Sequence, residues 1–187
     1  RRMWATIMRE RFGAKNSRSW QLPIHVQTSG VELTRQMPHL NIARVTIQAL
    51  GAILGGAQSL HTDSWDEAIR IPSKEAALLA LMTQHVLSEE SGAADVIDPL
   101  GGSFYVESLT DEMERRAWEE IHKIDSIGGM IRAVESGYVF KEITRSIGEH
   151  SAAVEREEKL IVGVNKYVLE EDEAKFEKLR EVIQDER

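Results

Sequence analysis

The sequence predicts an α/β protein, with about three strands of a parallel (β/α)8 (TIM) barrel followed by a mainly helical segment. Two short extended segments each end in small polar and imidazole side chains: HVQTSG at residues 25–30 and QSLHTDSWDEA at residues 58–68. An amphipathic helical pattern lies between them. Strand, polar tip, helix, strand, polar tip is the order of a parallel barrel, whose functional residues gather at the carboxyl ends of its strands.

The first strand is predicted by alternation, and a helical pattern precedes it. Residues 1–12 place apolar side chains on one helical face, and no capping residue comes before them. We therefore expect the chain to begin inside a helix, as a fragment or a subunit of a longer ancestor would. Residues 22–27 then alternate apolar and polar side chains, which favours a strand.

The next helix and strand are marked by turn residues. Residues 41–54 have the periodicity of a helix, which the glycines at 55–56 end. Residues 57–60 predict a short second strand. Ser73 is a good N-cap for a helix that runs to about Glu90.

A third strand is expected at residues 96–97, before a turn of composition DPLGG at residues 98–102. A closed barrel of this kind needs eight strands and about 250 residues. Three strands cannot close, so we expect either a second chain that supplies the missing strands or a different arrangement of this one.

The rest of the chain is predicted to be mostly helical, which divides it into a barrel part at residues 1–105 and a helical linker region at residues 106–187. A capping box at Ser108 starts a helix to about Ile127. Further segments are helices at residues 130–135, 140–156 and 172–183, and a strand or extended arm at residues 160–164.

Composition limits the classes of partner. The 187 residues carry a net charge of −8, which argues against nucleic acid or an anionic membrane surface as the main partner. The absence of cysteine excludes disulfides, thiolate catalysis and cysteine-ligated zinc. No apolar run has the length of a membrane span or the character of a signal peptide, so a cytoplasmic location is expected.

The polar strand residues favour ligand binding over metal binding or catalysis. The chain lacks the common nucleophile, metalloprotease and phosphate-loop signatures. His25, His61 and Asp63 form an incomplete ligand set, so we expect no metal site.

Barrel interiors are usually filled by Val, Ile and Leu, whereas this chain offers His25, Gln27, Ser59 and His61. Each of these side chains could be a buried polar group satisfied by backbone. Because two strand tips share the pattern, we favour an open channel for an extended polar ligand.

Seven short segments resemble, in the same order, those of the adenosylcobalamin-dependent acyl-CoA mutases, the methylmalonyl-CoA mutase family. They are RFGAKN at residues 11–16, HVQTSG at 25–30, QSLHT at 58–62, DEA at 66–68, DPLGGS at 98–103, GGM at 128–130 and VGVNK at 162–166. The resemblance places the chain at about the last three strands of the substrate-binding barrel of the catalytic (large) subunit, with the linker that follows.

The resemblance also implies site residues. In this family the pantetheine arm of coenzyme A threads the barrel along small polar side chains. Gln27 is then expected near the acyl thioester and carboxylate, and Ser59 at the pantetheine or substrate. His25 and His61 are expected in the channel wall.

Two acidic residues are implied as cofactor contacts. Glu67 is expected to accept hydrogen bonds from the ribose of the adenosyl group. Asp63 occupies a position associated with the same group, where the family usually has asparagine.

Other parts of the family's pattern are changed or missing. The family's Q-x-P-Y-N-N is QMPHLN at residues 36–41, so His39 and Leu40 replace an aromatic hydroxyl and an amide. The cobalamin-binding D-x-H-x-x-G does not occur in the chain. The tyrosine, arginine and histidine that grip the acyl group belong to the amino-terminal barrel half, outside this chain.

The resemblance implies radical isomerisation of methylmalonyl-CoA and succinyl-CoA, with adenosylcobalamin bound mainly by a domain or subunit absent from this chain. The alternatives are a mutase for isobutyryl-CoA or a related acyl-CoA, and a non-catalytic scaffold subunit derived from the barrel. The expected partners are the acyl-CoA substrate, the amino-terminal barrel part and a cobalamin-binding domain or subunit. The isolated chain is expected to form homo-oligomers and to have little or no activity.

Overall fold

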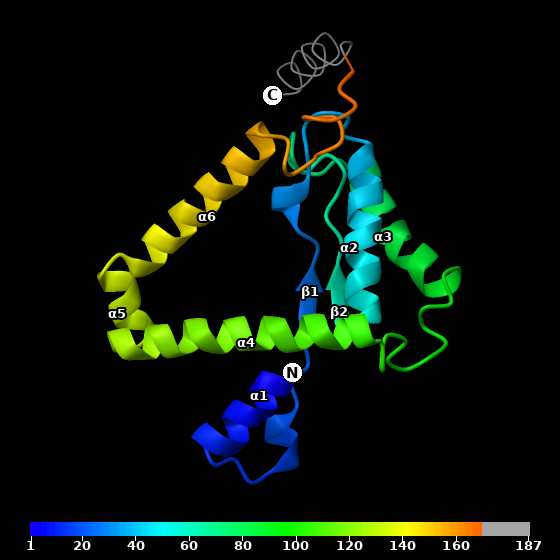
Figure 1. The fold of residues 1–187 in the computed structure, drawn as a ribbon. Coiled ribbons are helices and arrows are strands. Elements are labelled where there is room, and N and C mark those ends of the chain that lie inside the picture. The colour runs from blue at the N-terminus through cyan, green and yellow to red at the C-terminus, as the bar shows by residue number, and fades with distance from the viewer. Residues whose placement is uncertain (170–187) are drawn as a thin grey trace. The chain divides into compact units, whose positions relative to one another are not determined.

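The computed structural model describes residues 1–169, which form a mixed α/β structure with many helices and few strands (Figure 1). The elements are α1 (Arg2–Thr6), the π-helical turn η1 (Ile7–Arg11), the 3-10 turn η2 (Ser17–Trp20), β1 (His25–Gln27), the 3-10 turn η3 (Gly30–Glu32), α2 (Leu40–Leu54), β2 (Ser59–His61), α3 (Lys74–Glu89), α4 (Phe104–Ile127), α5 (Met130–Glu135) and α6 (Tyr138–Glu155).

The chain divides into two compact units. The first comprises Arg1–Leu33 and His39–Glu119, and the second comprises Thr34–Pro38 and the described residues from Glu120 onward. Both polar strand ends belong to the first unit. No helix of residues 1–169 is long and apolar enough to cross a membrane.

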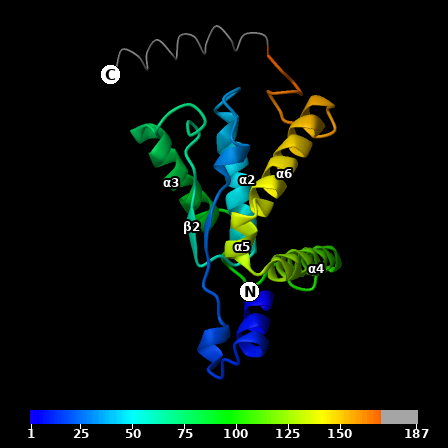
Figure 2. The same cartoon turned by 90° about the vertical axis from the view of Figure 1, so that its left-hand side faces the viewer.

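The two strands of the first unit lie side by side and run parallel, as predicted (Figure 1). His25 pairs with Ser59, and Gln27 pairs with His61. The backbone N–H of Thr28 extends the ladder by donating to the carbonyl of His61 at 3.1 Å. The helix α2 connects the strands and packs on β2 and α3, which Figure 2 shows from the side. This is one β–α–β unit.

The helix predicted at residues 41–54 is confirmed as α2, with the periodicity that its sequence indicates. Asn41, Val45 and Ala49 are four residues apart, and all three are buried. Ile47, on another face, is 72% exposed. The helix ends before Gly56, whose φ of +72° is readily adopted by glycine.

The predicted third strand at residues 96–97 is wrong, because these residues form bends between α3 and α4. Ile97 is fully exposed. A run of two apolar residues finds no partner strand in the part of the chain described, and Pro99, which follows it, lacks the N–H that a ladder requires. The described residues therefore form a sheet of two strands and not three.

The helix α4 begins one turn earlier than its sequence predicts, at Phe104 and not after Ser108. Ser103 provides the cap: its carbonyl accepts the N–H of Glu107 at 2.9 Å, and its hydroxyl accepts that of Val106 at 3.5 Å. The predicted capping box lies inside the helix, where Thr110 donates its hydroxyl to the carbonyl of Val106. The helix ends at Ile127, as predicted.

In the second unit α5 and α6 pack together, and α6 starts at Tyr138, two residues earlier than expected. The extended arm expected at residues 160–164 is instead a turn. It is closed by a bond from Gly163 N–H to the Lys166 carbonyl at 2.7 Å, and Gly163 has a φ of +80°. The helix predicted at residues 172–183 lies outside the described residues.

Candidate ligand-binding site at the strand ends

The four predicted substrate contacts lie on one face of the two-stranded sheet. Strand alternation and the parallel register place His25, Gln27, Ser59 and His61 together, all exposed. The opposite face is partly buried, at the central residue of each strand. The structure therefore brings the four side chains together on a face that is open in this chain. Their role in binding stays a prediction.

At the start of the strands, His25 and Ser59 form a cross-strand pair. The ring Nδ1 of His25 lies 2.7 Å from Ser59 Oγ. A neutral imidazole can donate or accept at this nitrogen, and the hydroxyl can do either. The pair can therefore adapt its donors and acceptors to a polar ligand.

At the carboxyl ends of the strands, the side chains converge on Asp63. Gln27 donates its amide Nε2–H to Asp63 Oδ1 at 2.8 Å. His61 Nε2 lies 4.0 Å from the same oxygen. Asp63 is only 4% exposed, so this carboxylate lies beneath the polar face and not on its surface.

Thr28 is a site residue that the sequence argument did not single out. Its hydroxyl donates to Asp63 Oδ2 at 2.8 Å and accepts the backbone N–H of Asp63 at 2.9 Å. Thr28 is buried because it follows the exposed Gln27 in an alternating segment. That alternation is the signal that could have identified it.

Glu67 is exposed and follows Asp63 by four residues in the loop after β2. Gly30 lies between them: a Cβ at this glycine would lie 3.8 Å from Asp63 Oδ2 and 3.9 Å from Glu67 Cγ. The two predicted cofactor contacts are thus brought together, but they differ. Both oxygens of Asp63 accept hydrogen bonds within the chain, whereas the Glu67 carboxylate is open to solvent.

The loop after β2 is held by buried polar groups. Asn41, which is fully buried, donates to the carbonyl of Trp65 at 2.9 Å. Asp66 Oδ2 accepts the N–H of Ser73 at 2.9 Å, and Asp66 Oδ1 is buried without a partner among residues 1–169. His39, one of the departures from the family pattern, places its ring 4.5 Å from that of Trp65.

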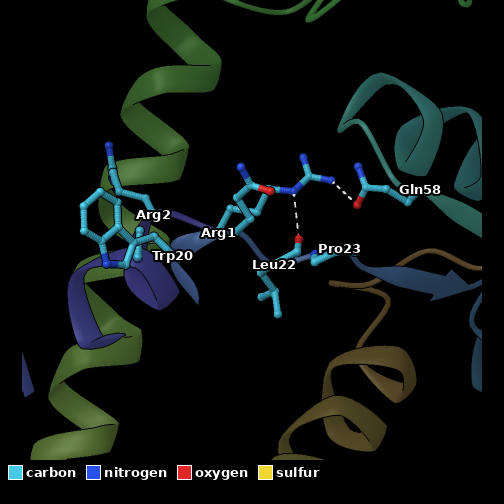
Figure 3. A pocket seen from close by; sticks show the side chains of 8 residues that line it. Arg1, Arg2, Trp20, Leu22, Pro23 and Gln58 are labelled. Carbon is cyan, nitrogen blue, oxygen red and sulfur yellow. Dashed lines mark hydrogen bonds between the residues drawn. The ribbon is translucent and has the colours of Figure 1, made fainter. Parts of the chain in front are cut away.

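A separate cavity of about 540 Å³ lies at the amino ends of the strands (Figure 3). Its lining residues are Arg1, Arg2, Ala5, Trp20, Gln21, Leu22, Pro23 and Gln58. The Arg1 guanidinium donates to the Leu22 carbonyl at 3.4 Å and to Gln58 Oε1 at 2.8 Å, as the dashed lines show. These donors link neighbouring segments of the chain, and none of the predicted site residues lines the cavity.

Within the described residues, no group of three His, Cys, Asp or Glu side chains is arranged to hold a metal ion.

Comparison with known proteins identifies the family. The family model for methylmalonyl-CoA mutase matches residues 1–186. The large subunit of the 2-hydroxyisobutanoyl-CoA mutase of Aquincola tertiaricarbonis is 46% identical over 177 residues, which cover 95% of this chain and 32% of that protein. The methylmalonyl-CoA mutase of Rhizobium meliloti is 46% identical over 173 residues, covering 92% of this chain and 24% of that protein. The mitochondrial human methylmalonyl-CoA mutase is 43% identical over 174 residues, which cover 93% of this chain and 23% of that protein.

The chain thus spans between about a quarter and a third of the length of these relatives, whose names are those of isomerases. The family match covers nearly the whole of this chain, and the order of its motifs is that of the family. The chain belongs to the methylmalonyl-CoA mutase family.

Proposed function

We propose that the chain is part of the catalytic subunit of an acyl-CoA mutase that isomerises methylmalonyl-CoA and succinyl-CoA by radical carbon-skeleton rearrangement. Its two parallel strands belong to a (β/α)8 barrel that other residues complete. The observation that carries the proposal is the exposed polar face of β1 and β2, where a barrel would normally have apolar filling. In the complete barrel this face lines the channel for the acyl-CoA.

The residues of this face bind and orient the substrate. The His25–Ser59 pair can exchange hydrogen bonds with the amides and hydroxyls of a pantetheine arm. Gln27 and His61 form the pair two residues further along the strands, on the same face and toward the acyl end. Once the barrel closes over them, these groups replace water around the substrate and hold it in one orientation.

The proposed cofactor is adenosylcobalamin, which when bound supplies the radical chemistry of the rearrangement. Glu67 fits the role of a ribose contact, because its exposed carboxylate can accept two hydroxyl donors. The chain contains no D-x-H-x-x-G motif for the cobalt ligand, so another domain or subunit binds most of the cofactor.

The relatives differ in the acyl group for which they are named. Relatives named for methylmalonyl-CoA and for 2-hydroxyisobutanoyl-CoA are equally similar, at 46% identity. The residues that contact the acyl group in this family belong largely to the amino-terminal half of the barrel. A mutase for isobutyryl-CoA or a related acyl-CoA is therefore the nearest alternative.

A second candidate function is that of a non-catalytic scaffold derived from the barrel. The observations that favour it are His39 and Leu40 in place of the family's aromatic hydroxyl and amide, and an Asp63 whose two carboxylate oxygens both accept hydrogen bonds within the chain. For such a scaffold, Asp63→Asn in the assembled protein leaves the affinity for adenosylcobalamin unchanged. A neighbouring reading frame that encodes the first part of the barrel instead favours a split enzyme.

The decisive experiment combines the chain with the polypeptides that supply the amino-terminal barrel half and the cobalamin-binding part. Methylmalonyl-CoA, isobutyryl-CoA and 2-hydroxyisobutanoyl-CoA are offered separately, and each product is measured by mass spectrometry. We expect conversion of methylmalonyl-CoA, a loss of at least tenfold in kcat/KM for Gln27→Ala, and no turnover by the chain alone. Thr110→Val, an exposed change on α4, is the matched control and leaves the rate unchanged. An assembly that neither binds acyl-CoA nor turns it over contradicts the proposal.

A further inference from the structure

We infer that Asp63 is a positioning residue: its buried carboxylate fixes the amide of Gln27, so that Gln27 meets the ligand with its carbonyl oxygen. This inference rests on the proposed function, in which Gln27 contacts the acyl-CoA. It assigns to Asp63 a role that differs from the cofactor contact implied by the resemblance. It also names the kind of ligand group that Gln27 binds, which is an N–H or O–H donor.

The orientation of the amide follows from the chemistry of the carboxylate. An ionised carboxylate accepts hydrogen bonds and cannot donate them. Gln27 approaches Asp63 Oδ1 at 2.8 Å, so the end of the amide that faces it must be the NH2 group. With the opposite orientation, two acceptor oxygens would face each other at this distance.

The carboxylate is itself held in place from the other side. The Thr28 hydroxyl donates to Asp63 Oδ2 at 2.8 Å, and the backbone N–H of Asp63 donates back to the same hydroxyl at 2.9 Å. Thr28 and Asp63 are 6% and 4% exposed. A buried carboxylate with both oxygens occupied has a fixed position, and hydrogen bonds to a charged group are among the stronger ones in proteins.

The remaining atoms of the Gln27 amide are left for a ligand. Its oxygen Oε1 accepts no hydrogen bond from residues 1–169, although the side chain lies on the exposed polar face. The amides of a pantetheine arm carry N–H donors that match this acceptor. An asparagine at position 63 could present either an oxygen or an NH2 group to Gln27, and would therefore allow both orientations of the Gln27 amide. The carboxylate of Asp63 allows only one.

The test exchanges the donor and the acceptor. In Gln27→Glu, two carboxylates face each other, and we expect coenzyme A to bind at least tenfold more weakly to the complete mutase. In the double variant Gln27→Glu with Asp63→Asn, the introduced asparagine donates its amide N–H to one oxygen of the introduced glutamate, and its carbonyl accepts the Thr28 hydroxyl. The second oxygen of that glutamate is then presented to the ligand as Oε1 of Gln27 was.

We therefore expect the double variant to bind coenzyme A within about threefold of the unmodified protein, measured by titration calorimetry. If Gln27 binds the ligand through its amide N–H, the double variant stays as weak as Gln27→Glu, and the inference is wrong. Gln48→Glu is the matched control. It also brings two carboxylates together, with Glu32, but at an exposed pair, and we expect its affinity to change less than twofold.

A second measurement separates this inference from the proposed function. In protein labelled with nitrogen-15 glutamine and studied without coenzyme A, one side-chain amide proton of Gln27 should exchange slowly with solvent. Asp63→Leu should raise that exchange rate at least tenfold. A rapidly exchanging amide in the unmodified protein contradicts the inference even if coenzyme A binds, whereas a protected amide with no binding of coenzyme A contradicts only the proposed function.

Discussion

At the scale of single residues, the site depends on buried polar side chains beneath an exposed polar face. Thr28 and Asp63 exchange two hydrogen bonds with each other, and Asp63 accepts a third from Gln27. A buried polar group that loses its partner costs more free energy than the bond contributes in an intact protein. The exposed face is thus only as well ordered as the buried pair that supports it.

Thr28→Val tests this support. The substitution keeps the shape of the side chain but leaves Asp63 Oδ2 and the backbone N–H of Asp63 without their partner. We expect the free energy of unfolding to fall by about 1–3 kcal/mol, measured by urea denaturation of the complete protein. Thr110→Val is the control, because its hydroxyl is exposed and bonds only to a helix carbonyl; a change there of more than about 0.5 kcal/mol would show that the loss is not specific to burial.

At the scale of elements, α3 starts where a serine side chain satisfies one of the helix's first backbone N–H groups. Ser73 accepts the N–H of Ala76 at 3.1 Å and starts α3, and its own N–H is held by Asp66 Oδ2 at 2.9 Å. The start of α3 is therefore fixed to the loop that carries Asp63 and Glu67.

Ser73→Ala removes this cap. Replacing a serine N-cap by alanine costs about 1 kcal/mol, so we expect a decrease of this size in the free energy of unfolding. Ser73→Asn keeps an acceptor in the same position and should change the value by less than about half as much. Equal losses in both variants would mean that packing of the serine, and not its hydrogen bond, starts the helix.

The helix α4 carries a cluster of ion pairs on its exposed surface. Glu112 accepts hydrogen bonds from Arg115 and, one residue further along, from Arg116, and these bonds lower the pKa of its carboxyl from an ordinary 4.5 to about 2. Because the pKa is lower in the folded protein, the ionised carboxylate favours the folded state above about pH 4.5. That contribution is lost as the pH falls from about 4.5 to about 2.

A carbon-13 titration of the glutamate side chains measures this pKa directly. We expect Glu112 to titrate near pH 2. Replacing both arginines by glutamine should return its pKa toward 4.5, because both causes of the shift are removed. An unshifted pKa in the unmodified protein would show that the ion pairs do not persist in solution, as is common for exposed pairs.

At the scale of the whole molecule, this chain leaves apolar helix faces uncovered. On α3, Leu78, Leu81 and Met82 are 55%, 48% and 40% exposed. The two strands likewise have edges without partners in the described part of the chain. In a complete (β/α)8 barrel, helices of this kind pack on neighbouring strands and helices, and each strand is paired on both sides.

The isolated chain should therefore associate with itself. Large apolar patches and unpaired strand edges both promote association, and we expect a two-fold dimer because that symmetry is the commonest. Light scattering over a dilution series, with and without coenzyme A, measures the molar mass. The triple substitution Leu78→Glu, Leu81→Glu and Met82→Glu should shift the chain toward monomer, and a chain that is already monomeric at micromolar concentration contradicts the barrel-fragment proposal.

The sequence by itself determined those features that depend on local periodicity and capping. The alternation around Val26 predicted the first strand, and the second, predicted at residues 57–60, lies at Ser59–His61. Asn41, Val45 and Ala49 share the buried face of the predicted helix. The cap at Ser73 was also correct. These predictions succeed because each depends on side chains only a few residues apart.

Only the tertiary structure decided which groups meet across long separations. Residues 96–97 looked like a strand, but a strand exists only when a partner supplies the other half of its hydrogen bonds. Asp63 is 36 residues from Gln27 and 35 from Thr28, and the register of β1 against β2 brings it into contact with both. The sequence shows a glutamine and an aspartate, but their contact across the sheet determines which end of the amide faces the carboxylate.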